Sequence, residues 1–147
     1  MTDIFISSDN ILSPVGLSTT DNFNRLKQHL SGIRLYNDKT MSEQPFYASL
    51  FKNGSEFLPP QPGKNYTKFE SLLIASISDA LTKTEIKATD KNTVLIISTT
   101  KGNISLIETE TPSKTVNEKI SLNSSAKLVA GHFGFINKPV IISNACI

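Results

Sequence analysis

In two segments of the first half of the chain, a helix-capping signal is followed by hydrophobic residues at helical spacing, which predicts two helices. Residues 18–20 offer hydroxyl groups that can cap a first helix, and Gly32 is expected to end it. Thr67 and Glu70 have the spacing of a capping box, in which two side chains satisfy two backbone N–H groups, so a second helix begins there. The expected apolar faces are Phe23, Leu26 and Leu30 in the first helix, and Phe69, Leu72, Leu73, Ile77, Ala80 and Leu81 in the second.

Three runs rich in β-branched residues predict strands. Residues 4–6, Ile-Phe-Ile, are expected to form the first strand. Residues 93–98 form a continuous apolar run, which is typical of a central strand with both faces buried. Residues 140–142, Val-Ile-Ile, follow a proline, which a strand tolerates at its first position, and predict a further buried strand. Strands that alternate with helices predict an α/β fold.

The segment between the last two predicted strands is mainly helical. Residues 104–108 predict a short helix, and the polar residues 109–118, with Pro112 among them, predict an irregular connection. Ser121 or Asn123 can then cap a third helix. Its expected apolar face is Leu122, Ala126, Val129 and Phe133.

The turn-rich middle of the chain predicts a hairpin and no domain boundary. Asn53-Gly54 is the strongest short hairpin signal, and it lies between the candidate strands 46–51 and 55–58. Residues 59–63 contain three prolines and a glycine, a stretch too short and stiff to be a flexible tether. With 147 residues, of which 38% are hydrophobic, the chain suits one domain with its own core.

Composition excludes several classes of partner and site. A net charge of +2, from 15 basic and 13 acidic residues, gives no electrostatic footprint for nucleic acid. No stretch approaches the roughly 20 apolar residues of a membrane-spanning helix, and the first residues lack the features of a signal peptide, so a cytoplasmic location is expected. One cysteine excludes an internal disulfide and a multi-cysteine zinc site.

That cysteine, Cys146, is the main candidate for chemistry. It comes four residues after the predicted strand 140–142, and α/β folds place their active sites beyond the carboxyl ends of strands. A lone cysteine beside apolar residues is more often an inert core residue, because reactivity requires exposure and a stabilised thiolate. Position alone therefore leaves open both a nucleophile and a plain α/β domain with a buried cysteine.

Several segments together resemble the β-ketoacyl synthases, the condensing enzymes of fatty acid and polyketide synthesis. They are the Ile-Leu-Ser-Pro-Val-Gly loop at 11–16, the Leu-Ser-Gly-Ile turn at 30–33, the Leu-Val-Ala-Gly-His-Phe-Gly-Phe segment at 128–135, Lys-Pro at 138–139, and Asn-Ala-Cys at 144–146. The order of these segments is that of the family, and the resemblance covers essentially the whole chain. Cys146 matches the family's nucleophile.

The resemblance implies a thiolase-like fold, in which two βαβαβαββ halves pack as a five-layer sandwich. Residues 1–147 match the front part of the first half, a mixed sheet with packed helices, so they form an incomplete N-terminal domain. Cys146 would take an acyl group from the phosphopantetheine of an acyl carrier protein before decarboxylative Claisen condensation with a malonyl unit. No cofactor is bound in the family. The implied partners are the carrier protein and a second subunit, in a homodimer or a ketosynthase heterodimer.

Two further residues are assigned to the acyl pocket by the same resemblance. Lys101 follows the strand 93–98 where many members carry a residue that borders the pocket, and Asn144 precedes the nucleophile. A lysine departs from the family pattern and argues against a plain aliphatic acyl chain, and a solvated turn lysine is the alternative interpretation. His132 is expected to be structural, because the family's two catalytic histidines come later in the chain, beyond Ile147.

A polypeptide that ends at Ile147 is expected to have little condensing activity by itself. In the family the cysteine begins a helix, whose N-terminus stabilises a thiolate, whereas here the α-carboxylate of Ile147 would disfavour it. A second interpretation is therefore a shortened, non-catalytic partner of the chain-length-factor type that pairs with a complete subunit. The presence of Cys146 favours the enzyme.

Overall fold

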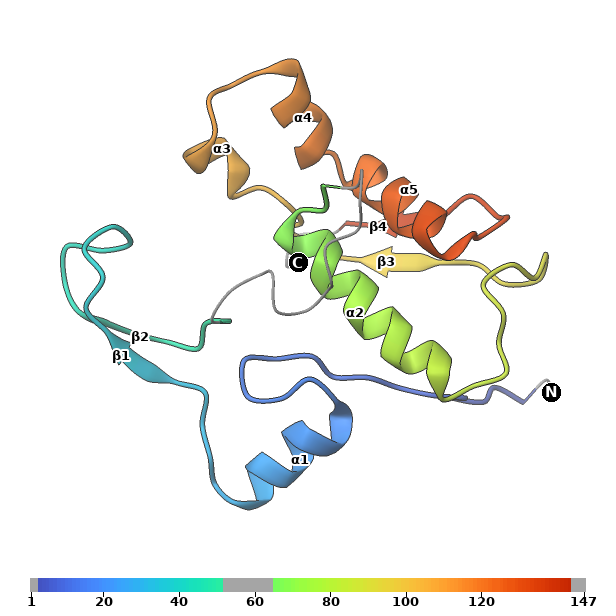
Figure 1. Cartoon of the computed structure of the whole chain (residues 1–147), viewed down its shortest axis with the longest axis horizontal. Coiled ribbons are helices and arrows are strands. Elements are labelled where there is room, and N and C mark those ends of the chain that lie inside the picture. The colour runs from blue at the N-terminus through green and yellow to red at the C-terminus, as the bar shows by residue number, and fades with distance from the viewer. Residues whose placement is uncertain (1–2, 52–64, 144–147) are drawn as a thin grey trace.

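The computed structural model describes residues 3–51 and 65–143. In these residues it contains five helices and two small two-stranded sheets, which is a mixed α/β arrangement (Figure 1). The predicted α/β class is confirmed at this level. The predicted turn at Asn53-Gly54 and the predicted site residues Asn144 and Cys146 lie outside the described residues.

Helix α2 (Lys68–Thr82) is the centre of the packed half of the molecule. Its capping box is present as predicted: Thr67 Oγ1 accepts the Glu70 N–H at 3.3 Å, and Glu70 Oε2 accepts the Thr67 N–H at 2.9 Å. Phe69, Leu73 and Ile77 of the expected apolar face pack against the core. The fully buried residue of this face is Ile74, between Leu73 and Ile77.

Helix α5 (Leu122–Phe133) packs against α2. Ser121 caps it, as one of the two predicted alternatives, and Gly134 ends it with a left-handed φ of 74°. Ala126 and Val129 of the expected face are buried together with Ala130.

Strands β3 (Ile96–Ser98) and β4 (Val140–Ile142) form a parallel pair, in which Ile97 lies opposite Ile141. The Val140 N–H donates to the carbonyl oxygen of Leu95 at 2.9 Å, which is one of the hydrogen bonds of the Ile96–Val140 pair. Parallel pairing requires a long crossover connection, and the chain provides it through helices α3 to α5.

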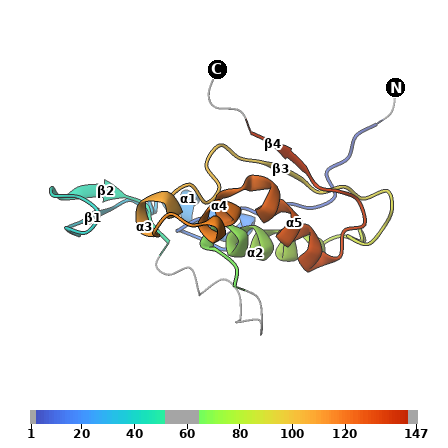
Figure 2. The same ribbon diagram turned by 90° about the horizontal axis from the view of Figure 1, so that it is seen from above.

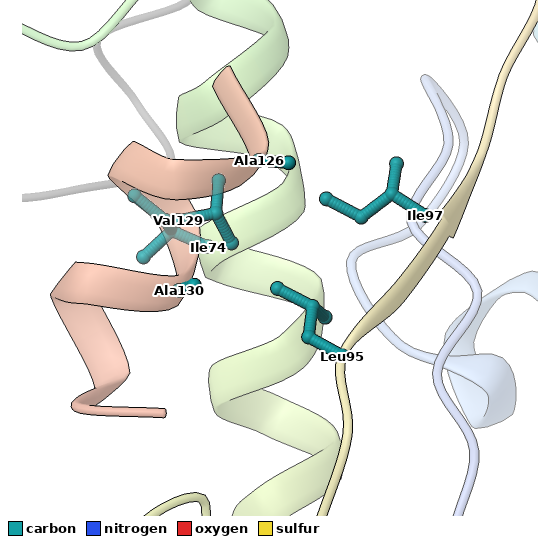
Figure 3. Close-up of a cluster of buried hydrophobic side chains, with 6 residues drawn as sticks. All are labelled: Ile74, Leu95, Ile97, Ala126, Val129 and Ala130. Atoms are coloured by element: carbon teal, nitrogen blue, oxygen red, sulfur yellow. The ribbon is translucent and has the colours of Figure 1, made fainter. Parts of the chain in front are cut away.

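The core lies on one face of this sheet. Leu95 and Ile97 point toward α2 and α5 (Figure 3), and both helices lie on the same side of the two strands (Figure 2). On the other face Ile96 is 59% exposed. The prediction that 93–98 is buried on both faces is therefore wrong within the described part of the chain. Val140 and Ile142 of β4, which were predicted to be buried, are 44% and 48% exposed.

Helix α1 (Thr19–Lys27) is confirmed, with Ser18 as its cap, but it ends before the predicted Gly32. His29 adopts a left-handed φ of 57° and turns the chain there. The expected apolar face is wrong, because its residues Phe23 and Leu26 are exposed and the buried residue is Asn22. The Asn22 side-chain amide donates to the carbonyl oxygens of Ile11, Gly16 and Ser18, at 2.8, 2.9 and 2.8 Å. The helix is thus fixed by hydrogen bonds to the loop before it.

Strands β1 (Arg34–Tyr36) and β2 (Phe46–Ala48) form an antiparallel pair in which the Tyr36 and Phe46 rings stack at 5.8 Å. The sequence analysis missed β1, whose three residues form no recognisable apolar run. The hairpin predicted between 46–51 and 55–58 is not tested, because 55–58 lie outside the described residues; within them β2 pairs with β1.

Two further predictions are corrected. Residues 4–6 form no strand, and their side chains are almost fully exposed. This segment is instead tied to α2 by its polar neighbours, since Asn10 Nδ2 donates to Ser76 Oγ at 3.2 Å.

The region 109–118, predicted to be irregular, contains most of helix α4 (Lys114–Ile120), which Ser113 caps and whose Val116 is buried. The proline-containing stretch before it ends at this cap, so the irregular part is shorter than expected. The short helix predicted at 104–108 is present as α3 (Leu106–Thr109).

Candidate functional site

The carboxyl ends of β3 and β4 meet at one edge of their sheet. The Thr99 N–H, just after β3, donates to the carbonyl oxygen of Ile142, the last residue of β4, at 3.1 Å. Segments that leave the two strands therefore start side by side. In α/β proteins this edge is where ligands bind.

The turn at residues 99–103 leaves β3 at this edge. Thr99 Oγ1 accepts the N–H groups of Lys101 and Gly102, each at 3.3 Å, which closes the turn on itself. Gly102 has a left-handed φ of 55°, and a Cβ atom there would overlap Cδ2 of Leu122 at the start of α5. The turn is thus compact and seated against α5.

Lys101 is exposed on this turn. Its ammonium group makes no hydrogen bond or ion pair with any residue in the described ranges. A cation without a carboxylate partner among the described residues could interact here with a polar or anionic group of a bound molecule. This is the one predicted acyl-pocket residue that the structure describes.

A buried carboxylate, that of Glu70, is hydrogen-bonded to the end of the turn 99–103. Glu70 is only 1% exposed, and its Oε1 accepts hydrogen bonds from Ser125 Oγ at 2.7 Å and from Asn103 Nδ2 at 3.4 Å. Asn103 Nδ2 also donates to the carbonyl oxygen of Lys119 at 2.9 Å. One carboxylate therefore joins α2, the end of α4, α5 and the turn, and its hydrogen bonds offset the cost of burial.

Of the hydrogen bonds made by the Glu70 carboxylate, only the one within the capping box is predictable from the sequence. The spacing of Thr67 and Glu70 predicted the hydrogen bond made by one carboxylate oxygen of Glu70. Its second oxygen is satisfied by Asn103 and Ser125, which are 33 and 55 residues away in the chain. No local spacing contains that information, because the contact depends on how α2 and α5 pack.

His132 lies on α5 and packs among aromatic residues. The Tyr66 hydroxyl is 2.9 Å from its Nδ1, and its ring contacts those of Tyr66 and Phe133 edge to face. These contacts agree with the structural role that the sequence analysis gave it. Cys146 and Asn144 come four and two residues after Ile142, outside the described residues.

In residues 3–51 and 65–143, no group of three or more histidine, cysteine or acidic side chains is arranged to hold a metal ion. Across the same residues, no helix combines the length and the apolar composition needed to cross a membrane.

No protein-family model matches the chain, and no curated protein matches its sequence.

Proposed function

We propose that this chain is the N-terminal portion of a β-ketoacyl-[acyl carrier protein] synthase with a thiolase-like fold, and that Cys146 is its nucleophile. One observation carries the proposal: the parallel strands β3 and β4 end together at the hydrogen bond between Thr99 and Ile142. One strand continues into the turn with Lys101, and the other into the segment with Cys146. The two segments that carry the sequence signals for an acyl site thus begin next to each other, at the edge of the sheet where α/β proteins commonly bind ligands.

The chemistry assigned to Cys146 is transfer of an acyl group between two thiols. Its Sγ attacks the carbonyl carbon of an acyl thioester on the phosphopantetheine of an acyl carrier protein. The new bond joins Sγ to that carbon, the bond to the carrier sulfur breaks, and the carrier thiol leaves with the proton that Cys146 gives up. No oxidant or reductant is required.

Lys101 would border the acyl chain at the edge of the sheet. Its ammonium group has no partner within residues 3–51 and 65–143, and this disfavours a purely aliphatic chain, since burying an unpaired cation against hydrocarbon is costly. An acyl chain that carries a polar group is the better fit. Asn144 is proposed for the same pocket.

The uncovered face of the β3·β4 sheet also supports the proposal. The apolar side chains of Val94, Ile96, Val140 and Ile142 are between 44% and 59% exposed there. A sheet with apolar residues on both faces is typical of layered α/β proteins, in which further layers cover the second face. A second synthase subunit, in a homodimer or heterodimer, is the partner that we propose in addition to the carrier protein.

The test is acylation of the protein as its cell makes it, followed by intact mass. Incubation with an acyl-acyl carrier protein should add one acyl group, and neutral hydroxylamine should remove it, because thioesters are cleaved and amides are not. The variant Cys146→Ala should remain unmodified. Equal acylation of Cys146→Ala, or no acylation of the unaltered protein, would contradict the assignment.

The second candidate is a non-catalytic partner of the chain-length-factor type. The same apolar face favours it, because such a partner must pack against a complete ketosynthase subunit. It predicts a stable complex with that subunit and no acyl group on Cys146. The acylation experiment therefore separates the two candidates.

A further inference from the structure

The two arginines of this chain line the same hollow. Arg25 on α1 and Arg34 at the start of β1 border a space of about 180 Å³ that Pro14 and Val15 of the loop 11–16 also line. At about 30 Å³ for each water molecule, this space holds roughly six waters, which is enough for one tetrahedral anion. Among its lining residues in the described parts of the chain there is no aspartate or glutamate.

Neither guanidinium group has a partner in the described chain. The ion pairs in these residues are Lys83 with Asp79 and Lys119 with Glu110, and no hydrogen bond involves either arginine side chain. Two positive charges at one hollow repel each other, and an anion bound between them offsets this repulsion. Planar guanidinium groups match the oxygen atoms of phosphate with paired N–H donors, so a phosphate group is the anion that they fit best.

Neutral donors complete the lining. Ser31 Oγ accepts the Ile33 N–H at 3.1 Å, which leaves the hydroxyl proton of Ser31 available to a ligand. The Tyr36 ring is held by its stacking on Phe46, and its hydroxyl group makes no hydrogen bond with a described residue. The hollow thus combines two cations with two hydroxyl donors.

A second hollow adjoins the first and extends the space available to a ligand. Its volume is about 440 Å³, and it shares the residues Pro14, Val15, Leu30, Ser31 and Gly32 with the arginine hollow. Gly32 keeps the junction open, because a Cβ atom there would approach Ser49 Oγ to 2.5 Å and Val15 Cγ1 to 2.7 Å. A phosphate in the first hollow can therefore carry a small organic group in the second.

We propose that Arg25 and Arg34 form a binding site for a phosphate monoester of a small organic molecule. The phosphate binds both arginines, and its organic part lies along Pro14 and Leu30 in the adjoining hollow. This site goes beyond the proposed acyl transfer and involves neither Lys101 nor Cys146.

Isothermal titration of the protein with three compounds tests the proposal. They are inorganic phosphate, 4′-phosphopantetheine, and pantetheine as the analogue without phosphate. Phosphopantetheine should bind at least tenfold more tightly than either of the others, because only it fills both hollows. Tighter binding of inorganic phosphate would overturn the organic part of the proposal, and no binding of either phosphate compound would overturn the site.

Variants then locate the site. Arg25→Gln and Arg34→Gln should each weaken phosphopantetheine binding at least tenfold. Lys27→Gln is the matched control: it removes the same charge from the same helix, but Lys27 lies over the Phe23 ring and does not line the hollow. It should bind within twofold of the unaltered protein. Equal weakening by all three variants would overturn the site, since it would show only a general effect of charge.

Folding and the proposed function are checked separately. Both arginines are exposed, so circular dichroism of the two variants should match the unaltered protein, and Arg25→Lys should retain part of the binding. Cys146→Ala should bind phosphopantetheine normally. Failure of the acyl transfer would therefore leave this site standing, and failure of phosphate binding would leave the acyl transfer standing.

Discussion

Ser125 Oγ donates a hydrogen bond of 2.7 Å to Glu70 Oε1 in the interior, where both residues are 1% exposed. This bond links the first half of α5 to the first turn of α2. Since Asn103 approaches the same oxygen, the position of the turn that carries Lys101 depends on a carboxylate that never contacts solvent. The stability of the core and the geometry of the candidate site are therefore coupled.

Removal of this carboxylate should destabilise the fold. Glu70→Ala leaves the polar groups of Ser125, Asn103 and the Thr67 N–H without a partner, at a cost of about 2–4 kcal/mol in the free energy of unfolding. Urea denaturation measures it. Asp79→Ala on the same helix is the control, because Asp79 forms a surface ion pair with Lys83 and its loss should cost less than about 1 kcal/mol. Equal effects of the two variants would contradict a structural role for Glu70.

Any side chain at Gly102, in the turn before α3, should lower the stability of the fold. Gly102→Ala combines a left-handed φ with overlap of Leu122, and we expect a loss of about 1–3 kcal/mol. Gly131→Ala is the matched variant, because its added Cβ meets no atom within 4 Å and α5 gains a better helix former. It should stabilise the protein by up to about 1 kcal/mol. Thermal unfolding of both variants checks the contrast.

The two faces of β3 should respond differently to truncation. Ile97 is in the core, and Ile97→Ala should cost about 2–5 kcal/mol. Ile96 is 59% exposed on the opposite face, so Ile96→Ala should cost less than about 1 kcal/mol in a dilute sample of the chain alone. A large loss for Ile96→Ala, dependent on protein concentration, would show that another molecule covers this face.

Asp38 provides a prediction about pH. The Thr40 hydroxyl and backbone N–H donate to Asp38 Oδ1 at 2.6 and 2.9 Å, and these bonds lower the pKa of the exposed Asp38 carboxyl below its usual 3.8. A lowered pKa in the folded state stabilises the fold above the unfolded-state pKa, and this small contribution disappears as pH falls through the lowered value. Carbon-13 NMR titration should show a higher pKa in Thr40→Ala, but not in Thr40→Ser, which keeps the hydroxyl. An unchanged pKa in Thr40→Ala would contradict the assigned cause.

Local signals in the sequence predicted the elements of the core. The capping box at Thr67, the cap at Ser121 and the β-branched run 140–142 each depend on adjacent residues, and the structure has α2, α5 and β4 there. The apolar run 4–6 carries the same kind of signal, and it forms no strand because no neighbouring strand is paired with it in the described chain.

What sequence reasoning missed depends on contacts between distant residues. Strand β1 is recognisable only through its pairing with β2, and the burial of Glu70 only through the packing of α2 on α5. Exposure of Ile96 has the same origin, since a strand's own residues do not reveal how many layers cover it. Lys101 does follow a strand of a parallel pair, as its place after an apolar run indicated, and its assignment to an acyl pocket stays a prediction.

The buried Asn22 amide has a consequence for the dynamics of the first half. Because this one side chain holds three carbonyl groups of the preceding loop, α1 and residues 11–18 should open together, as one cooperative unit of local unfolding. The exposed apolar residues of α1 contribute little to its protection. Backbone amides of α1 should therefore exchange with deuterium much faster than those of α2 and α5, and Asn22→Ala should accelerate exchange throughout this unit while leaving the α2–α5 core protected.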